Sequence, residues 1–432
     1  MIRLHPLPDV DHACPHCHVP LEVAGWYIPG MRMLADLRCE QCGKEFYGDL
    51  ASGHGIHMAS LVEKETGVVH APYNTWFATW LAQMYRKRTT TPVQLTVQEY
   101  RPLCRQVVLL NCLDRVYGHS LLKLLNAEYY LAHRRDLDLV LMIPRCLGWM
   151  VPDGAEQVWI VEQSLDRSEE WNDSLAAEID SRLRPLEVCW LSVAFPHPHP
   201  NTYTIQRFTR VPPFPLDEWE TRLDKPVITF IWREDKKRRM WSALDARVDG
   251  RLPRTMRSTF KQCLIRSSPL RQQTERLLSL ATTLRQQLTS LDFGIAGVGE
   301  PGGMPGWVTD LRTTQISEST ERKWAQRYAS SHIVVGVHGS GMLLPTAHAG
   351  AAVELVPPGK WVNMMDATLF RRGDAREIVY RYRYYPLNTA ADDLAWAIIQ
   401  QLNAHREMTR WMPLTACDHS LLPANKRMAI RS

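Results

Sequence analysis

The segment His332–Pro358 constrains the fold more than any other stretch of this 432-residue chain. Ile333–Val337 is a continuous run of apolar residues, most of them β-branched, which is typical of a strand buried on both faces of a sheet. A His-Gly-Ser-Gly turn at 338–341 follows directly. Met342–Ala347 then has the pattern of a helix start, and Ala352–Val356 reads as a second buried strand. The segment therefore predicts parallel strands in an α/β sheet.

The glycine turn in this segment is the first indication of chemistry. A glycine turn between a parallel strand and a helix lets backbone amides approach an anion, and the helix dipole favours negative charge there. In open α/β sheets, ligands bind beyond the carboxyl ends of the strands. We therefore expect residues 338–341 to form one wall of a phosphate or nucleotide site.

Composition sets broad limits on the kind of protein. The length predicts two or three domains, and 45% hydrophobic with 22% charged residues is ordinary for a globular protein. The net charge of +5 suits a small anionic ligand but does not indicate nucleic acid. No run of eighteen apolar residues predicts a transmembrane helix, and the first residues lack the apolar core of a secretory signal. We expect a cytoplasmic protein.

Four cysteines near the N-terminus predict a metal site. Each of the two CxxC pairs closes a knuckle that aims two thiolates at one point, and two knuckles complete a tetrahedral Zn²⁺ site. Leu21–Ile28 and Met31–Leu37 can supply strands of a small ribbon between them. Four thiolates leave no open position, so this zinc is expected to be structural. The predicted ligands are Cys14, Cys17, Cys39 and Cys42, and a Cys₃His variant would draw on His12, His16, His18, His54 or His57. The ribbon's mixed charges favour packing or partner docking over nucleic-acid binding.

The middle of the chain alternates strands and helices. A strand at Val107–Leu110 leads into the polar loop Asn111–Ser120 and an amphipathic helix that runs to about His133. Further strands are expected at Asp138–Pro144, Val158–Val161 and Leu186–Phe195. Proline-rich stretches at 196–200 and 211–215 read as a linker. The predicted domains are a ribbon at 1–60, an α/β domain at 61–210 and a second α/β domain at 211–432.

Two blocks of the second half carry a family resemblance. VVGVHGSGMLLPTAHAGAAVELVPP at 334–358 resembles the signature region of the family 61 glycosyltransferases, where an HGAG-type turn precedes a helix and a Glu-containing strand. VITFIWREDKKRRMW at 227–241 resembles that family's strand ending in Arg, an acidic residue and a basic cluster. The resemblance covers roughly residues 225–390, and Ser340 stands where the family more often has Ala.

The resemblance implies a glycosyltransferase of the two-domain B architecture, with two Rossmann-like domains beside the ribbon. A nucleotide-sugar donor would bind the C-terminal domain, and a carbohydrate, protein or small-molecule acceptor would approach from the N-terminal domain. We expect inverting transfer to an acceptor hydroxyl without a catalytic metal, since no DxD motif in an apolar strand context is present. The alternative is a catalytically inactive glycosyltransferase-like protein that docks a partner or nucleic acid through its ribbon. An enzyme that converts the sugar nucleotide itself, such as an epimerase, is a further alternative.

The donor diphosphate needs cations and amides, because no metal would neutralise it. Arg233 follows the strand Val227–Trp232, where a side chain faces the ligand edge, although the basic run after it is also typical of a solvated surface. On the resemblance, His338 would contact the donor instead of packing as a neutral core side chain. Glu354 would hold ribose hydroxyls or serve as a structural partner. The predicted donor-site residues are Arg233, Arg238, Arg239, His338, Gly339, Ser340, Gly341 and Glu354.

An inverting transfer needs a general base for the acceptor hydroxyl, and three residues are candidates. Asp114 and His119 lie on the Asn111–Ser120 loop of the acceptor-side domain. Asp114 could instead pair with Arg115 at a helix start, and His119 could pack beneath the helix. Glu300, in the glycine-rich stretch 298–303, is the third candidate.

Overall fold

The computed structural model describes residues 1–5, 7–72, 75–103, 106–234, 268–371 and 373–411. The chain divides into two compact units, Met1–Val211 and Pro212–Ser432. Both are mixed α/β, as the alternation of strand and helix patterns predicts. No helix in these described ranges combines the length and apolar character needed to cross a membrane.

The second unit is built on a six-stranded, fully parallel sheet. Numbered within the unit, the strands lie in the order third, second, first, fourth, fifth, sixth, which is the doubly wound order of dinucleotide-binding sheets. The order reverses between the first and fourth strands, β12 and β15. The strands are β12 (Val227–Trp232), β13 (Asp292–Val298), β14 (Val308–Thr313), β15 (Ile333–Val337), β16 (Ala351–Val356) and β17 (Tyr382–Pro386).

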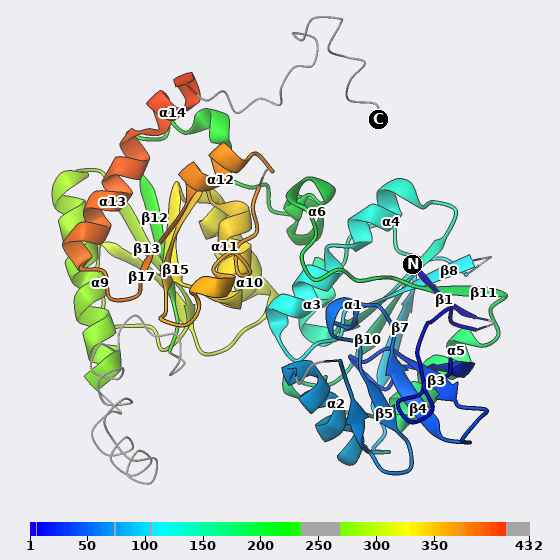
Figure 1. Cartoon of the computed structure of the whole chain (residues 1–432). Coiled ribbons are helices and arrows are strands. Elements are labelled where there is room, and N and C mark those ends of the chain that lie inside the picture. The colour runs from blue at the N-terminus through cyan, green and yellow to red at the C-terminus, as the bar shows by residue number, and fades with distance from the viewer. Residues whose placement is uncertain (6, 73–74, 104–105, 235–267, 372, 412–432) are drawn as a thin grey trace, which may run out of the picture. The chain divides into compact units, whose positions relative to one another are not determined.

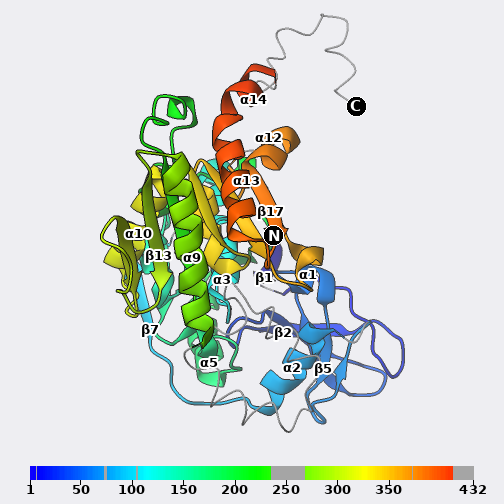
Figure 2. The same cartoon turned by 90° about the vertical axis from the view of Figure 1, so that its left-hand side faces the viewer.

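Helices cover both faces of this sheet (Figure 1). On one face α9 (Ser268–Gln287) and α13 (Ala391–Asn403) lie side by side (Figure 2), because apolar residues recur at helical spacing and pack on inward strand residues. The other face carries α10 (Glu318–Ser330) and α11 (Leu343–His348). The remaining elements of this unit among the described residues are η4 (Leu216–Glu218), η5 (Ser340–Met342), η6 (Trp361–Asn363), α12 (Ala375–Arg381) and α14 (His405–Trp411).

The first unit has its own six-stranded sheet, with four parallel central strands and an antiparallel strand at each edge. In sheet order these are β1 (Ile2–His5), β11 (Val188–Leu191), β8 (Gln106–Asn111), β9 (Asp138–Pro144), β10 (Gln157–Val161) and β7 (Leu95–Glu99). The other elements around it are α2 (Trp76–Arg86), α3 (Tyr117–Leu124), α4 (Ala127–His133), η1 (Arg145–Met150), η2 (Leu165–Arg167), α5 (Asp173–Leu183), η3 (Pro200–Thr202) and α6 (Ile205–Thr209).

An antiparallel sheet of five strands occupies the N-terminal part of this unit and continues past residue 60. Its elements are β2 (Glu22–Tyr27), β3 (Leu34–Arg38), β4 (Glu45–Asp49), α1 (Gly55–Met58), β5 (Leu61–Glu63) and β6 (Val69–His70). Leu37 and Phe46 of this sheet are fully buried in the same apolar core as Val107 and Leu109 of β8. The ribbon therefore folds as part of the first unit and shares its core.

The helix expected to run to about His133 is in fact two helices, α3 and α4. The break falls at Leu125 and Asn126. The side-chain amide of Asn126 donates to the carbonyls of Leu122 and Lys123 at 3.1 and 3.0 Å, and so competes with the helical backbone pattern.

Candidate functional site

The carboxyl ends of β12 and β15 lie next to each other at the point where the strand order reverses. Arg233 follows β12, and the His-Gly-Ser-Gly turn follows β15. The two segments are in close contact, because a Cβ placed on Gly341 would lie 3.1 Å from Arg233 Nη1. Gln273 of α9 donates to the Arg233 carbonyl at 3.0 Å and holds the end of the strand. The structure thus brings together two segments that are about a hundred residues apart in sequence.

The turn itself is shaped by glycine. Gly339 has φ +144°, a conformation that L side chains rarely adopt. Its carbonyl accepts the N–H of Met342 at 2.8 Å, which starts the helical segment. His338 and Gly339 are buried, Ser340 is half-buried and Gly341 is exposed. The tip of the turn therefore reaches solvent while its base is fixed in the sheet.

His338 and Glu354 form a buried pair behind the turn. His338 Nδ1 lies 2.9 Å from Glu354 Oε2, and the two side chains are 4% and 2% exposed. Thr368 donates from Oγ1 to the other carboxylate oxygen at 2.6 Å, and the Tyr384 hydroxyl lies 2.9 Å from Thr368 Oγ1. Of the two roles expected for Glu354, this closed arrangement fits a structural partner better than a ribose ligand.

Arg312, on β14, is a basic residue of this sheet that is not among the site residues predicted from the sequence. Its guanidinium carbon lies 4.8 Å from the Trp232 ring centroid, and Asp310 holds the guanidinium at 2.9 and 2.7 Å. The sequence pattern that could have indicated Arg312 is the placement of polar residues within the strand-like stretch Val308–Thr313. Glu300 is exposed in the loop after β13. Arg238 and Arg239 fall outside the described residues.

The first unit brings Asp114 and His119 together at the carboxyl end of β8. The loop is closed by two side-chain turns, in which Asn111 Oδ1 accepts the N–H of Leu113 and Asp114 Oδ1 accepts that of Val116. His119, in the first turn of α3, then places Nδ1 3.2 Å from Asp114 Oδ1. The carboxylate can accept an Nδ1–H and leave Nε2 as the basic nitrogen.

Two further residues complete this cluster and were missed as site residues. Lys123 Nζ lies 3.0 Å from Asp114 Oδ2, and both side chains are almost fully buried. His54, at the start of α1, places Nε2 3.4 Å from His119 Nδ1. His54 comes from the antiparallel sheet region, and the sequence suggests it only as an alternative metal ligand. No local pattern links it to Asp114, sixty residues away.

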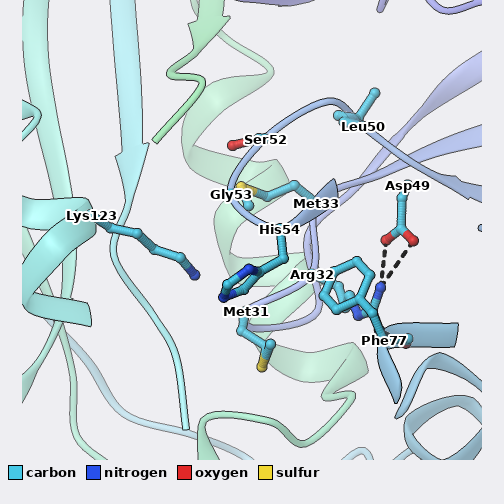
Figure 3. A pocket seen from close by; sticks show the side chains of 10 residues that line it. All are labelled: Met31, Arg32, Met33, Asp49, Leu50, Ser52, Gly53, His54, Phe77 and Lys123. Atoms are coloured by element: carbon cyan, nitrogen blue, oxygen red, sulfur yellow. Dashed lines mark hydrogen bonds and ion pairs between the residues drawn. The ribbon is translucent and has the colours of Figure 1, made fainter. Parts of the chain in front are cut away.

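Burial and charge tune this cluster. Burial alone would raise the pKa of Asp114, but the Lys123 ammonium and the His119 contact outweigh it and hold that pKa below its usual range. Burial lowers the pKa of His54 to about 4, and His119 adds to the effect, so His54 is neutral near pH 7. Figure 3 shows His54 and Lys123 projecting into one small cavity beside Arg32, whose Nη1 donates to both carboxylate oxygens of Asp49. Its volume is about 10 Å³, room for one water molecule.

The four cysteines converge as their spacing predicts. Cys14, Cys17, Cys39 and Cys42 place their sulfurs within 4.8 Å of one another, so the group could hold a metal ion. Gly43, after the second knuckle, has φ +73°. The backbone N–H of Cys42 lowers the pKa of Cys39 to about 7. Four convergent thiols of this kind form a closed ligand set.

Comparisons with known proteins identify no family. No family model matches the chain, and no curated protein matches it. Among solved structures it is similar to the structure of the E. coli ADP-heptose LPS heptosyltransferase II, at 12% identity and a TM-score of 0.36, over 71% of this chain and 100% of that one.

Proposed function

We propose that the protein is a glycosyltransferase that moves a sugar from a nucleotide-sugar donor to an acceptor hydroxyl, with inversion and without a catalytic metal. The contact between Arg233 and the glycine turn, at the strand-order reversal of a doubly wound sheet, is the observation that carries the proposal. That position is where open α/β sheets bind nucleotides. The resemblance of the same two segments to family 61 glycosyltransferases supports the nucleotide-sugar reading.

The donor half of the mechanism follows from these residues. Arg233 would neutralise the diphosphate as it leaves, since a guanidinium can hold two phosphate oxygens at once. The backbone of Gly339–Gly341 would approach the same group, because its tip is exposed and carries no bulky side chain. His338, held at Nδ1 by Glu354, would present its remaining ring edge to the donor. Glu354 is then a positioning residue.

The acceptor half would use the Asp114–His119 pair. In this proposal His119 Nε2 takes the proton of the attacking hydroxyl, and the Asp114 carboxylate stabilises the imidazolium that forms. Asp114 suits the role because Lys123 and His119 keep it ionised.

We propose that the four-cysteine ion is zinc and that its role is structural. Tetrahedral thiolate sites of this spacing favour zinc and leave no open position for substrate. The metal would fold the antiparallel sheet, which in turn carries His54 to the Asp114–His119 pair. This gives the ribbon a role within the enzyme that requires neither nucleic acid nor a partner.

The test is a panel of nucleotide sugars. Thermal stabilisation of the full-length protein by one of them, with slow release of free nucleoside diphosphate, is the expected result. Conversion of the sugar nucleotide without release would indicate an epimerase-type enzyme instead. Stabilisation with no turnover toward any acceptor or water would favour the inactive binding protein.

Metal independence is tested in the same assay. Turnover measured at once after adding excess EDTA should be unchanged, because the thiolate-bound ion is not catalytic. Immediate loss that Mg²⁺ or Mn²⁺ restores would contradict this part of the proposal.

A further inference from the structure

A second cluster of metal-ligating side chains lies beside the four cysteines. His16 sits inside the first knuckle, between Cys14 and Cys17, while Glu63 ends β5 and His70 ends β6. One ligand atom from each of these three residues lies within 4.8 Å of the others. Neither the spacing of the cysteines nor the proposed transferase chemistry uses them.

The distances approach those of a coordination sphere. His16 Nε2 and Glu63 Oε2 are 3.3 Å apart, and His70 Nε2 and the same oxygen are 3.8 Å apart. A tetrahedral Zn²⁺ with bonds near 2.0–2.2 Å separates its ligand atoms by about 3.3–3.5 Å. Closing around an ion would require only small movements of the His70 ring.

The surroundings of Glu63 favour an ion over a simple ion pair. Glu63 is buried, with a side chain 4% exposed, and Lys44 already pairs with its Oε1. One ammonium neutralises the carboxylate, so two additional imidazoles are not needed for its charge. His70 Nε2 is buried and makes no hydrogen bond within the described part of the chain. A buried ring nitrogen that faces a carboxylate oxygen beyond hydrogen-bond distance suits a shared metal.

The same contacts supply the outer shell that such sites use. Lys44 would hold Oε1 and leave Oε2 for the ion, in the way that outer-shell partners orient carboxylate ligands. The Phe46 ring packs against His16 and His70, with centroids at 6.2 and 6.3 Å, and restricts both imidazoles. The His16 and His70 side chains are 37% and 28% exposed, so solvent reaches one side of the cluster.

We propose that His16, Glu63 and His70 form a second metal site, which takes a divalent ion of the zinc or cobalt class and keeps water at its open position. Two imidazoles and one carboxylate are the ligand set of catalytic zinc sites, whereas the four thiolates form a closed structural set. The chain would then hold two ions of different kinds. The first site places His16 for the second, because His16 lies within its knuckle.

The experiment counts metals on the full-length protein. Protein is saturated with Zn²⁺, desalted and analysed for metal content, and wild type is expected to hold two ions per chain. His70→Ala and Glu63→Gln, made separately, should each hold one and should bind the second Zn²⁺ more than about 100-fold more weakly, beyond the loss typical of outer-shell changes. His133→Ala, an exposed histidine on α4, is the matched control and should keep two. One ion in saturated wild type, or two in both variants, would overturn the proposal.

Cobalt substitution keeps the test decisive if either variant fails to fold. Co²⁺ at the four thiolates produces sulfur-to-cobalt charge transfer in the near ultraviolet. A second Co²⁺ on nitrogen and oxygen ligands should add weak visible absorption with no further charge transfer. If the added cobalt gives only thiolate bands, or no new absorption, the second site does not exist.

Discussion

At the scale of single residues, Arg233 is the side chain on which the proposed donor site most depends. Its guanidinium lies against the exposed tip of the glycine turn, so removing it would take a positive charge away from that turn. In the first unit, Asp114 and His54 are the corresponding residues of the proposed acceptor site. Burial and neighbouring charges set the ionisation of both.

Arg233→Ala should lower transfer activity roughly 10²–10³-fold, because a charge-assisted contact to the leaving diphosphate contributes about 2–4 kcal/mol in the transition state. Arg233→Lys should recover only part of the rate, since an ammonium cannot hold two oxygens. The control is Arg271→Ala, an exposed arginine of α9 paired with Glu275. Steady-state rates with the donor from the panel decide the question. Unchanged donor affinity in both Arg233→Ala and His338→Ala would place the donor elsewhere.

Asp114→Asn should destabilise the protein by about 3–5 kcal/mol, because it leaves the Lys123 ammonium buried without its counter-charge. Asp114→Asn combined with Lys123→Met should recover much of that loss in denaturant unfolding. The double variant should nevertheless stay inactive if His119 is the base. An active double variant would show that the Asp114–Lys123 ion pair is not needed for catalysis.

His54 predicts a pH dependence of stability. Its pKa is about 4 in the folded protein and 6.5 in the reference state, so below pH 6.5 the unfolded chain binds the extra proton. This contribution is present above pH 6.5 and is lost as the pH falls toward 4. His54→Gln should therefore lose less melting temperature than wild type between pH 7 and pH 4. Parallel pH curves for the two proteins would show that His54 does not titrate in this way.

At the scale of elements, the turn between β15 and α11 combines two separate requirements for glycine. Gly339 provides a backbone conformation, whereas Gly341 provides space for the Arg233 guanidinium. Substitutions at Gly339 and at Gly341 should therefore separate an effect on folding from an effect on function.

Gly339→Ala should destabilise the second unit by about 1–3 kcal/mol, because alanine is strained at φ +144°. Gly341→Ala should have little effect on stability but should lower activity, on the order of 10²-fold, by displacing Arg233. Melting temperature and transfer rate measured on both variants provide the comparison. Equal effects of the two substitutions on both quantities would mean that the turn acts only as a structural hinge.

At the scale of the whole molecule, the two compact units have separate hydrophobic cores. The five-stranded antiparallel sheet beside the four-cysteine cluster shares the core of the first unit only. Loss of the metal should therefore lower the stability of the whole first unit and leave the stability of the second unit unchanged.

Chelation of the four-cysteine ion, or Cys17→Ser, should lower the unfolding temperature of the first unit and leave that of the second unchanged. Activity should decline with the unfolding, not before it. Scanning calorimetry resolves the two transitions, and Cys112→Ala, at a buried cysteine outside the cluster, is the control. A first transition that is insensitive to chelation would show that the ribbon folds without metal.

The sequence alone determined the features that depend on local pattern. The strands β9, β12 and β15 coincide with the predicted strands. Each is a continuous apolar run, which is typical of a strand that is buried on both faces of a parallel sheet. The cysteine cluster also follows from spacing, since each knuckle is closed within four residues. The position of Arg233 at a strand end was also predicted, because it directly follows the apolar run of β12.

Tertiary structure decided the features that depend on residues distant in sequence. The strand order, and with it the contact between Arg233 and Gly341, requires crossover connections that no local pattern specifies. The partner of His338 is Glu354 on the neighbouring strand, and only the pairing of β15 with β16 brings the two buried side chains together. Lys123 reaches Asp114 from α3, the helix that also carries His119, whereas His54 reaches His119 only through the packing of the antiparallel sheet region on the first unit's core. Side-chain chemistry can be read along the chain, but which groups meet is set by packing between elements.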